Sequence, residues 1–370
     1  MRARRLARSS LRERASSDRL VEVAGAVCGV HAQVQTSAEL QLAARVDGAT
    51  RADVRGALWE ERALVKAWTL RGTLHLHPAS ELPLWLAARR AVVGSEGGGL
   101  PEWRDPAGVL HPALSADEVE AARAAVWDAL DGRCLLRDEL AAEVVKRLGA
   151  APRERLRSGF AFFLGGLCQG PPQGSRITLA RPDQWIEGWR DVDEDSALRE
   201  VCRRFLHTYG PARPADFVEW FGTAEFRVAD ARRLFEALAD ELEEIDVDGR
   251  GAFVLAGDRS FPEPRHQVRL LPEYDVYVMG FRERAQLVPE AVRGLIASRG
   301  SGRYEGPAAT RLVLVDGVAA GLWERRTRGR RLELDVRLAR RLERARRAEL
   351  EREAERLGAF LGLEPVLGAV

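Results

Sequence analysis

The sequence predicts an α+β fold, mainly helical, with three tandem winged-helix units followed by a β-rich C-terminal barrel or sheet. A pattern of three helices and a β-hairpin occurs three times before about residue 260. Beyond that point, extended runs separated by glycine turns replace the helical pattern. A chain of 370 residues, 46% apolar and 31% charged, is long enough for several globular cores. We expect domains at 1–95, 111–190, 194–260 and 262–370.

Local signals place the helices of the first unit. Asp18 can cap the first helix, and Gly29 stands where its C-terminal cap belongs. Thr36 and Glu39 have the spacing of a capping box for the second helix, and Thr50 can cap the third. A β segment follows, in which Thr69, Arg71, Thr73, His75 and His77 share one face and Gly72 indicates a bulge or turn.

The later units repeat this order with different sequences. A capping box at Ser115 and Glu118 begins the second unit, and Asp248-Gly249 forms the hairpin turn of the third. Helices are predicted over 116–130, 136–148, 153–165, 195–208, 213–221 and 224–243, and a hairpin with Pro171, Pro172 and Gly174 at its tip. In the C-terminal region, turns at Asp316-Gly317 and Arg328-Gly329 separate strands, and a helix near 337–357 closes the chain.

Charge is distributed unevenly along the chain, although 57 basic and 56 acidic residues nearly balance. Residues 1–90 carry 15 basic and 9 acidic side chains, and residues 321–350 carry 11 and 5. Residues 181–250 are acidic, with 10 basic and 18 acidic side chains. The basic ends can form phosphate-facing surfaces, or each cluster can be a solvated helix face.

The sequence favours a reduced, cytoplasmic location. No run approaches the roughly 18 apolar residues of a membrane span. The basic N-terminus lacks the apolar run and cleavage site of a secretory signal. None of the four cysteines forms a C-x-x-C pair, so a zinc ribbon or a thioredoxin-type motif is excluded.

Gln33 and Gln35 are the first candidate site residues. They lie two apart between one predicted helix and the next, so an extended connector would turn both amides to one side and Val34 into the core. Each amide offers one acceptor and two donors, and the pair can hold a water or a sugar oxygen without carrying charge. Two exposed turn glutamines are the alternative explanation of the same spacing.

Four segments resemble the AlkZ-like branch of a winged-helix DNA glycosylase family that also includes YcaQ-like enzymes. They are HAQVQ at 31–35, WTLRGTLHLH at 68–77, GPARPADFVEWFG at 210–222 and LLPEYDVYVMGFRER at 270–284. The Gln33-Val34-Gln35 run is similar to the catalytic Gln-apolar-Gln motif of that branch. The resemblance implies three winged helices, excision of bulky N7-alkylguanines and, in some members, unhooking of interstrand crosslinks. Several members give self-resistance to bacteria that make DNA-alkylating natural products.

Two neutral amides suit this chemistry. A cationic N7-alkylguanine departs as a neutral base without protonation, and the sugar develops oxocarbenium character. The protein then has to orient water and stabilise charge, which Gln33 and Gln35 can do although neither is a strong base. The two lysines of the chain, Lys66 and Lys146, lie in no recognisable nucleophile motif. We therefore expect monofunctional hydrolysis without strand cleavage through a Schiff base.

Further residues are candidates for contact with DNA. Arg71, Thr73 and His75 can reach phosphate or sugar, and Gln169, Gln173 and Arg176 lie near the predicted hairpin tip. Solvent-facing strand and wing residues are the alternative for both sets. His75 and His77 with His111 offer a weak case for a metal site. We expect no metal and no cofactor, and we assign Asp275 a supporting role or an ordinary ion pair with arginine.

The expected partner is double-stranded DNA containing alkylated purines, bound by a monomer without an obligate protein partner or a membrane. A non-catalytic winged-helix DNA-binding protein or transcriptional regulator is the alternative function. Such regulators usually act as symmetric dimers on palindromes, whereas three units in one chain suit an asymmetric clamp around one lesion. A structural DNA-binding protein without lesion preference is a third possibility.

Overall fold

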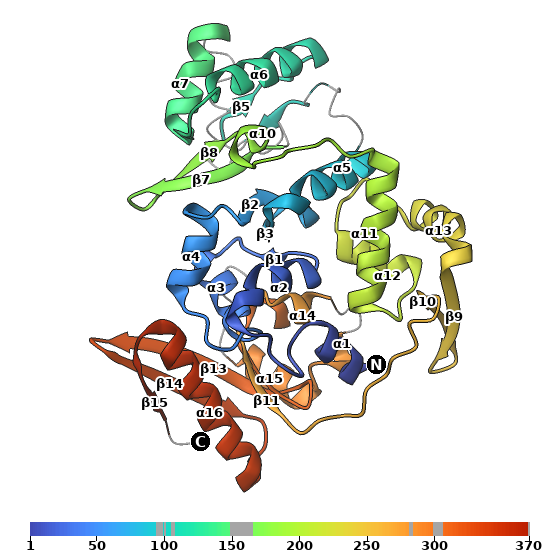
Figure 1. Ribbon diagram of the computed structural model, residues 1–370, viewed down its shortest axis with the longest axis vertical. Coiled ribbons are helices and arrows are strands. Elements are labelled where there is room, and N and C mark those ends of the chain that lie inside the picture. Colours follow the sequence, from blue (N-terminus) through green and yellow to red (C-terminus); the bar gives the residue numbers. More distant parts are fainter. Residues whose placement is uncertain are drawn as a thin grey trace.

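The computed structural model describes residues 1–93, 99, 101–104, 108–148, 166–280, 284–298 and 306–368. Helices and strands are mixed along this chain, and the strands lie in two main sheets (Figure 1). Within the described residues, no helix is both long and apolar enough to cross a membrane. The helix predicted at 153–165 lies outside the described residues.

The N-terminal region forms the centre of the molecule in Figure 1. Its elements are α1 (Arg2–Arg8), α2 (Leu20–Ala26), β1 (Val30–His31), α3 (Gln35–Ala43), α4 (Arg51–Trp59), β2 (Leu64–Trp68), β3 (Leu74–Pro78) and α5 (Leu82–Val93). Thr50 caps α4 as predicted, in a capping box with Asp53. Asp18 does not cap α2, because it lies inside a 3₁₀ turn over Ser17–Arg19.

Two other local predictions of this region need correction. The capping box at Thr36 is wrong, because α3 begins at Gln35 and its N-cap is Val34, whose side chain makes no capping bond. The β segment at 69–77 is not continuous, because a 3₁₀ turn over Leu70–Gly72 separates β2 from β3. Gly72 has φ +59°, so it is needed for a turn rather than a bulge.

A six-stranded sheet joins the first and second regions in the order β1-β3-β2-β7-β8-β6. The second region contains β4 (Trp103–Arg104), β5 (Leu110–His111), α6 (Ala116–Ala129), β6 (Leu135–Leu136), α7 (Arg137–Leu148), β7 (Cys168–Gln173), β8 (Arg176–Ala180) and α10 (Pro182–Trp185). Ser115 and Glu118 form the predicted capping box of α6. The two predicted hairpins meet where Ala67 pairs with Cys168. They therefore form one sheet rather than two separate wings.

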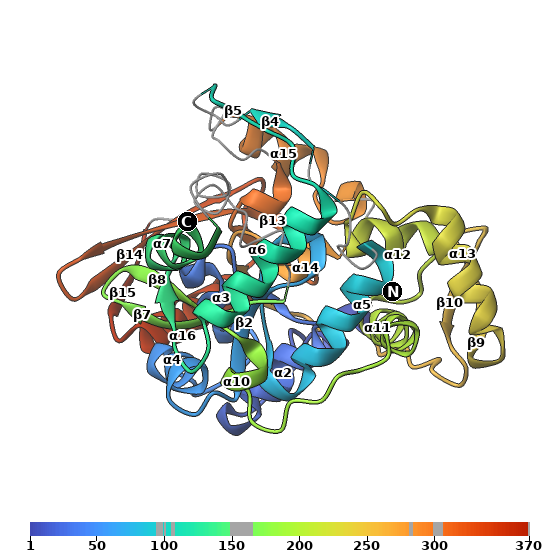
Figure 2. The same ribbon diagram turned by 90° about the horizontal axis from the view of Figure 1, so that it is seen from above.

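The third region is an aromatic helical cluster with a hairpin. It contains α11 (Glu194–Tyr209), α12 (Pro214–Phe221), α13 (Val228–Ala237), β9 (Leu242–Val247) and β10 (Arg250–Leu255). Phe205, Phe217 and Trp220 pack their rings within 6 Å of one another in its core. Asp248 and Gly249 both have positive φ, as the predicted hairpin turn requires. Figures 1 and 2 place this cluster at the opposite end of the molecule from β14 and β15.

The C-terminal region is an open five-stranded sheet in the order β11-β12-β13-β14-β15. Its elements are β11 (Val268–Leu271), α14 (Val276–Met279), α15 (Glu290–Ala297), β12 (Leu312–Val315), β13 (Val318–Arg328), β14 (Arg331–Leu338), α16 (Arg344–Leu361) and β15 (Glu364–Leu367). The closing helix α16 begins later than predicted, because β14 occupies 331–338. One hydrophobic core joins this sheet and α16 to α2 and α3, and so fixes the connector after β1.

Candidate active site

Gln33 and Gln35 lie on the connector between β1 and α3. Gln33 is exposed, and Gln35 is partly buried as the first residue of α3. Val34 between them is extended, with φ −109° and ψ 111°. Its side chain is 38% exposed, so the prediction that Val34 points into the core is wrong. The helix start at Gln35, rather than a continuous extended run, sets the direction of the second amide.

Both amides are anchored on the β2–β3 hairpin. The Oε1 of Gln35 accepts a hydrogen bond of 2.9 Å from the Nζ of Lys66 on β2. The Oε1 of Gln33 accepts a longer bond of 3.4 Å from the backbone N–H of Leu74 on β3. Leu74 pairs with Trp68, two residues beyond Lys66 on β2. Neighbouring positions of one hairpin therefore hold the two carboxamides.

Lys66 determines which way the Gln35 amide faces. An ammonium group only donates, so the atom next to it must be the carbonyl oxygen of Gln35. The Nε2 of Gln35 is then directed elsewhere, buried and without a hydrogen-bond partner among the described residues. Gln35 can thus donate to a bound oxygen but has its carbonyl occupied. The Gln33 carbonyl keeps a lone pair that can accept a proton from water.

The sequence analysis missed this role of Lys66. Lys66 is 4% exposed, and burial lowers its pKa to about 8, against an opposing effect of Glu39. The Glu39 carboxylate is fully buried and lies 3.1 Å from Arg51 and 3.0 Å from Arg55. A lone lysine in the apolar run LVKAW was the available sequence signal.

Three histidines form a buried array beside this hairpin. His31 on β1 pairs with His75 on β3, and their rings meet edge to face at 5.3 Å. The ring of His77 lies 6.0 Å from His75 and 4.7 Å from Trp85. All three are at most 4% exposed, so they are neither strand-surface residues nor, in the case of His75, available for direct contact with DNA.

These histidines are neutral at physiological pH. Burial, followed by the charges of Arg71 and Lys66, lowers the pKa of His31 to about 4. Burial also lowers the pKa of His77 to about 3 and that of His75 well below its usual value. His111 lies on β5 of a separate two-stranded sheet. No group of three metal-binding side chains occurs in the part of the chain that the structure describes.

Arg71 is a cation on the turn between β2 and β3. It lies in the 3₁₀ turn with φ 55° and ψ 17°, a conformation that costs energy for a residue other than glycine. Its stem packs on Gly222, where a Cβ would lie only 2.4 Å from the Arg71 Cγ. Burial lowers its pKa to about 10. Over the described ranges, its guanidinium makes no hydrogen bond or ion pair, and it is therefore available to an anion.

Of the other residues predicted to contact DNA, some are exposed at the hairpin tip and others are buried or hold a turn. Gln173 and Arg176 pair at the end of the β7–β8 hairpin and are exposed, as predicted. Gln169 is not near the tip, because it pairs with Leu179 inside the sheet and is 3% exposed. The hydroxyl of Thr73 donates to the carbonyl of Leu70 at 3.2 Å and so closes the turn that carries Arg71.

Asp275 lies outside this array. It forms a fully buried bidentate pair with Arg45, at 2.7 and 2.8 Å, and caps α14 through the N–H of Tyr277. Gln41 on α3 links the pair to the connector, because it accepts from Arg45 through its backbone carbonyl and its Nε2 donates to the carbonyl of His31 at 2.9 Å.

Comparisons with known proteins identify the family of the chain. A family model described as "DNA glycosylase AlkZ-like" matches residues 24–360. The chain is 34% identical over 316 residues to an "Interstrand DNA cross-link repair glycosylase" of Streptomyces sahachiroi, covering 82% of this chain and 81% of that protein. The solved Streptomyces sahachiroi DNA glycosylase AlkZ superposes with a TM-score of 0.80 at 30% identity, over 99% of this chain and 98% of the other. The chain therefore belongs to the AlkZ-like DNA glycosylase family.

Proposed function

We propose that this DNA glycosylase hydrolyses the N-glycosidic bond of cationic N7-alkylguanines in duplex DNA, including bulky adducts and interstrand crosslinks. The observation that carries the proposal is the anchored pair of amides, Gln33 on Leu74 and Gln35 on Lys66. The Streptomyces relative, named an interstrand DNA cross-link repair glycosylase, supports the crosslink activity. Self-resistance to a DNA-alkylating natural product is the cellular role that we propose for it.

The two amides have different parts in the proposed reaction. The free N–H of Gln35 donates to one lone pair of the attacking water, and the carbonyl of Gln33 accepts one of its protons. The second lone pair attacks C1′ of the sugar while the C1′–N9 bond breaks. The electron pair of the broken C1′–N9 bond stays with N9 and neutralises the cationic base, so no acid has to protonate the leaving group. The surplus proton passes to solvent, because an amide is too weak a base to keep it.

Phosphate contacts come from separate elements in this proposal. The guanidinium of Arg71, which has no hydrogen bond or ion pair with any described residue, suits a phosphate beside the lesion. Gln173 and Arg176 at the hairpin tip suit the DNA backbone further along. The buried histidines remain neutral and so avoid adding charge beside a developing oxocarbenium ion. We propose that the three regions before the C-terminal sheet, the first two joined by a shared sheet, act in a single chain as a monomeric clamp.

The test uses defined duplexes carrying N7-methylguanine, a bulky N7-alkylguanine or an N7-linked crosslink. The protein is expected to release free base and to separate crosslinked strands, leaving alkali-labile abasic sites. Borohydride in the same reactions is expected to trap no protein–DNA adduct, because hydrolysis forms no Schiff base. Protection of a defined sequence without base release would instead identify a DNA-binding regulator. A trapped adduct would identify Lys66 or another amine as a nucleophile.

Lys66→Met is expected to reduce kcat about 10- to 100-fold with little change in KM, because the Gln35 amide loses the donor that orients it. The ammonium form is a donor only, whereas the neutral amine also offers a lone pair and fixes the amide less well. Since the pKa of Lys66 is about 8, the kcat of the wild type should fall as pH rises through that value. In Lys66→Met, kcat should not fall as the pH rises through about 8.

Two substitutions control this measurement. Lys66→Arg retains a donor and should recover part of the activity. Lys146→Met removes the exposed lysine paired with Glu143 and should leave kcat unchanged. A pH profile that is the same in the wild type and in Lys66→Met would show that Lys66 has only a structural role.

A further inference from the structure

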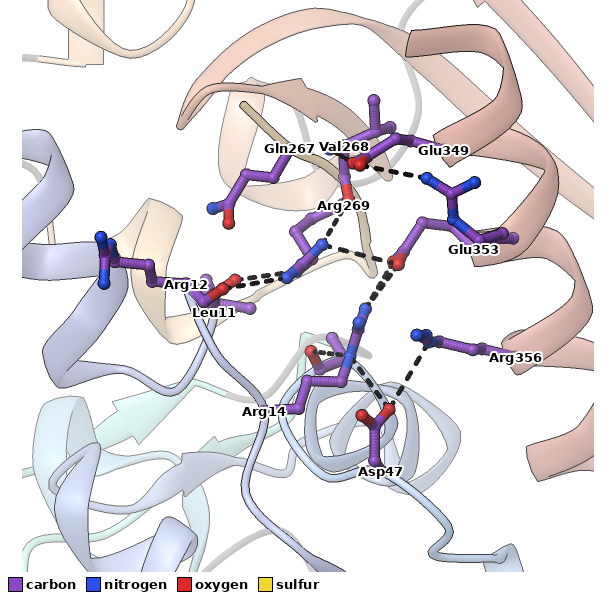
Figure 3. Close-up of polar contacts among 12 residues, drawn as sticks. Leu11, Arg12, Arg14, Asp47, Gln267, Val268, Arg269, Glu349, Glu353 and Arg356 are labelled. Carbon is purple, nitrogen blue, oxygen red and sulfur yellow. Dashed lines mark hydrogen bonds and ion pairs between the residues drawn. The ribbon is translucent and has the colours of Figure 1, made fainter. Parts of the chain in front are cut away.

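A polar cavity lies between the N-terminal segment, β11 and α16 (Figure 3), and neither Gln33 nor Gln35 lines it. Its volume is about 390 Å³, and it is half open to solvent. Six arginines and one histidine line it against four carboxylates, so positive charge is in excess. An excess of arginine in a concave site favours an anionic ligand.

The floor of the cavity is built from two guanidinium groups that share one buried carboxylate, and the half-exposed carboxylate of Asp47 lies 3.9 Å from Arg14. Arg14 donates to both oxygens of Glu353, at 2.6 and 2.7 Å, and Arg269 lies 3.6 Å from the same carboxylate. Arg14 is 5% exposed, Glu353 is 7% exposed and Arg269 is 10% exposed. One buried carboxylate therefore faces two guanidinium groups. Burial and the neighbouring Arg14 lower the pKa of Arg269 to about 10.

Backbone contacts hold the two guanidinium groups in place. Arg269 donates to the carbonyl of Leu11 at 2.8 Å, and Arg14 donates to that of Ala44 at 3.0 Å. Figure 3 shows both arginines converging on the carboxylate of Glu353. The charges are thus fixed before any ligand arrives, which reduces the cost of ordering on binding.

Gln267 is the independent sign of a ligand. It lines the cavity and is 3% exposed, yet neither its amide nitrogen nor its amide oxygen has a hydrogen-bond partner among the described residues. Its backbone N–H is satisfied by Asp316 at 2.9 Å, so the side chain alone is left unpaired. Buried amides are almost always hydrogen-bonded in folded proteins, and a bound group would supply the missing partner.

The arginines at the mouth of the cavity can exchange their ion-pair partners for a ligand. Arg265, Arg352 and Arg356 are 44 to 55% exposed and pair with rim carboxylates. The Nε of Arg12 is buried without a partner in the described chain. Exposed ion pairs of this kind are weak, so these guanidinium groups can turn to an incoming anion at small cost.

We propose that this cavity binds a phosphate group, with Gln267 and Arg12 as donors inside and Arg356 closing over it. A tetrahedral oxyanion accepts hydrogen bonds on several sides and matches the fork of arginine, and its charge offsets the excess on the lining. The group comes either from free phosphate or from the backbone of bound DNA. The inference does not depend on the proposed base excision, because no residue of the amide pair takes part.

The test uses the full chain and two probes. In the first arm, inorganic phosphate is titrated by calorimetry at constant ionic strength, and the wild type should show saturable binding to one site. In the second arm, an undamaged duplex is titrated with and without phosphate. Phosphate that competes with the duplex identifies the DNA backbone as the source. Saturable phosphate binding without competition identifies free phosphate.

Gln267→Leu and Arg356→Ala should each weaken binding at least tenfold for the probe, phosphate or duplex, that the wild type binds. Gln267→Leu removes an unpaired buried amide, so it should fold, and Arg356→Ala changes a side chain at the mouth. Arg344→Ala on the same helix lies outside the cavity lining and should bind like the wild type. Wild-type protein that responds to neither probe would overturn the proposal. Equal binding by all four proteins would overturn it as well.

Discussion

Asp275→Asn is expected to lower the free energy of unfolding by about 3–5 kcal/mol, because it leaves a fully buried guanidinium without its counter-charge. Both side chains of the Arg45–Asp275 pair are 0% exposed, and two hydrogen bonds of 2.7 and 2.8 Å join them. An asparagine can accept from only one of the two guanidinium nitrogens. The remaining N–H groups would have no water within reach.

The same substitution should reach the active site through α3. Arg45 also donates to the carbonyl of Gln41 at 2.9 Å, and the Gln41 amide bonds both the carbonyl of His31 and the N–H of Val276. These bonds hold the connector that carries Gln33 and Gln35 against the C-terminal region. A loosened pair therefore disturbs the position of both amides as well as the stability of the fold.

Denaturant unfolding of the purified variants measures this effect. Asp335→Asn is the matched control, since Asp335 pairs with Arg337 at 3.5 Å, both side chains are exposed, and the change should alter stability by about 0.5 kcal/mol or less. Replacing both partners, as in Arg45→Met with Asp275→Leu, should recover much of the loss because no buried charge remains. A loss below about 1 kcal/mol for Asp275→Asn would contradict the assignment.

Local sequence signals predicted helices where no distant partner competes. Ser115 and Glu118 cap α6 as expected, because both side chains are exposed at the start of the helix and have no other partner among the described residues. The same spacing at Thr36 and Glu39 failed. The Glu39 carboxylate is fully buried and is held by Arg51 and Arg55 of α4, so it cannot turn back to the helix start.

The candidate site shows the same division between local and distant contacts. The spacing of Gln33 and Gln35 could be recognised in the sequence, and so could the hairpin residue Arg71. The partners that orient them could not, because Lys66 follows Gln35 by 31 residues and meets it only through the folding of β2 against α3. The burial of His75 could not be predicted either. The alternation of residues along a strand identifies its two faces but does not show which face other elements cover.

Gln35→Ala is expected to lower kcat for release of N7-methylguanine by about 10²- to 10³-fold, the usual effect of removing one oriented donor from a reacting site. The variant loses the N–H that holds the attacking water and leaves the Lys66 ammonium without its 2.9 Å acceptor. KM should change little, because the phosphate contacts that we propose come from Arg71 and Arg176 and not from Gln35. Single-turnover kinetics on one defined duplex separate the two quantities.

Gln33→Ala should also reduce kcat, but by less, because the carbonyl of Gln33 has only a 3.4 Å contact to Leu74 and a solvent water can replace it. Gln184→Ala is the control, since this exposed glutamine likewise bonds a backbone N–H, that of Gly132 at 2.8 Å, but belongs to α10. It should retain wild-type kcat. Near-wild-type base release by a correctly folded Gln35→Ala protein would exclude the amide pair as the group that positions water, whatever the crosslink activity.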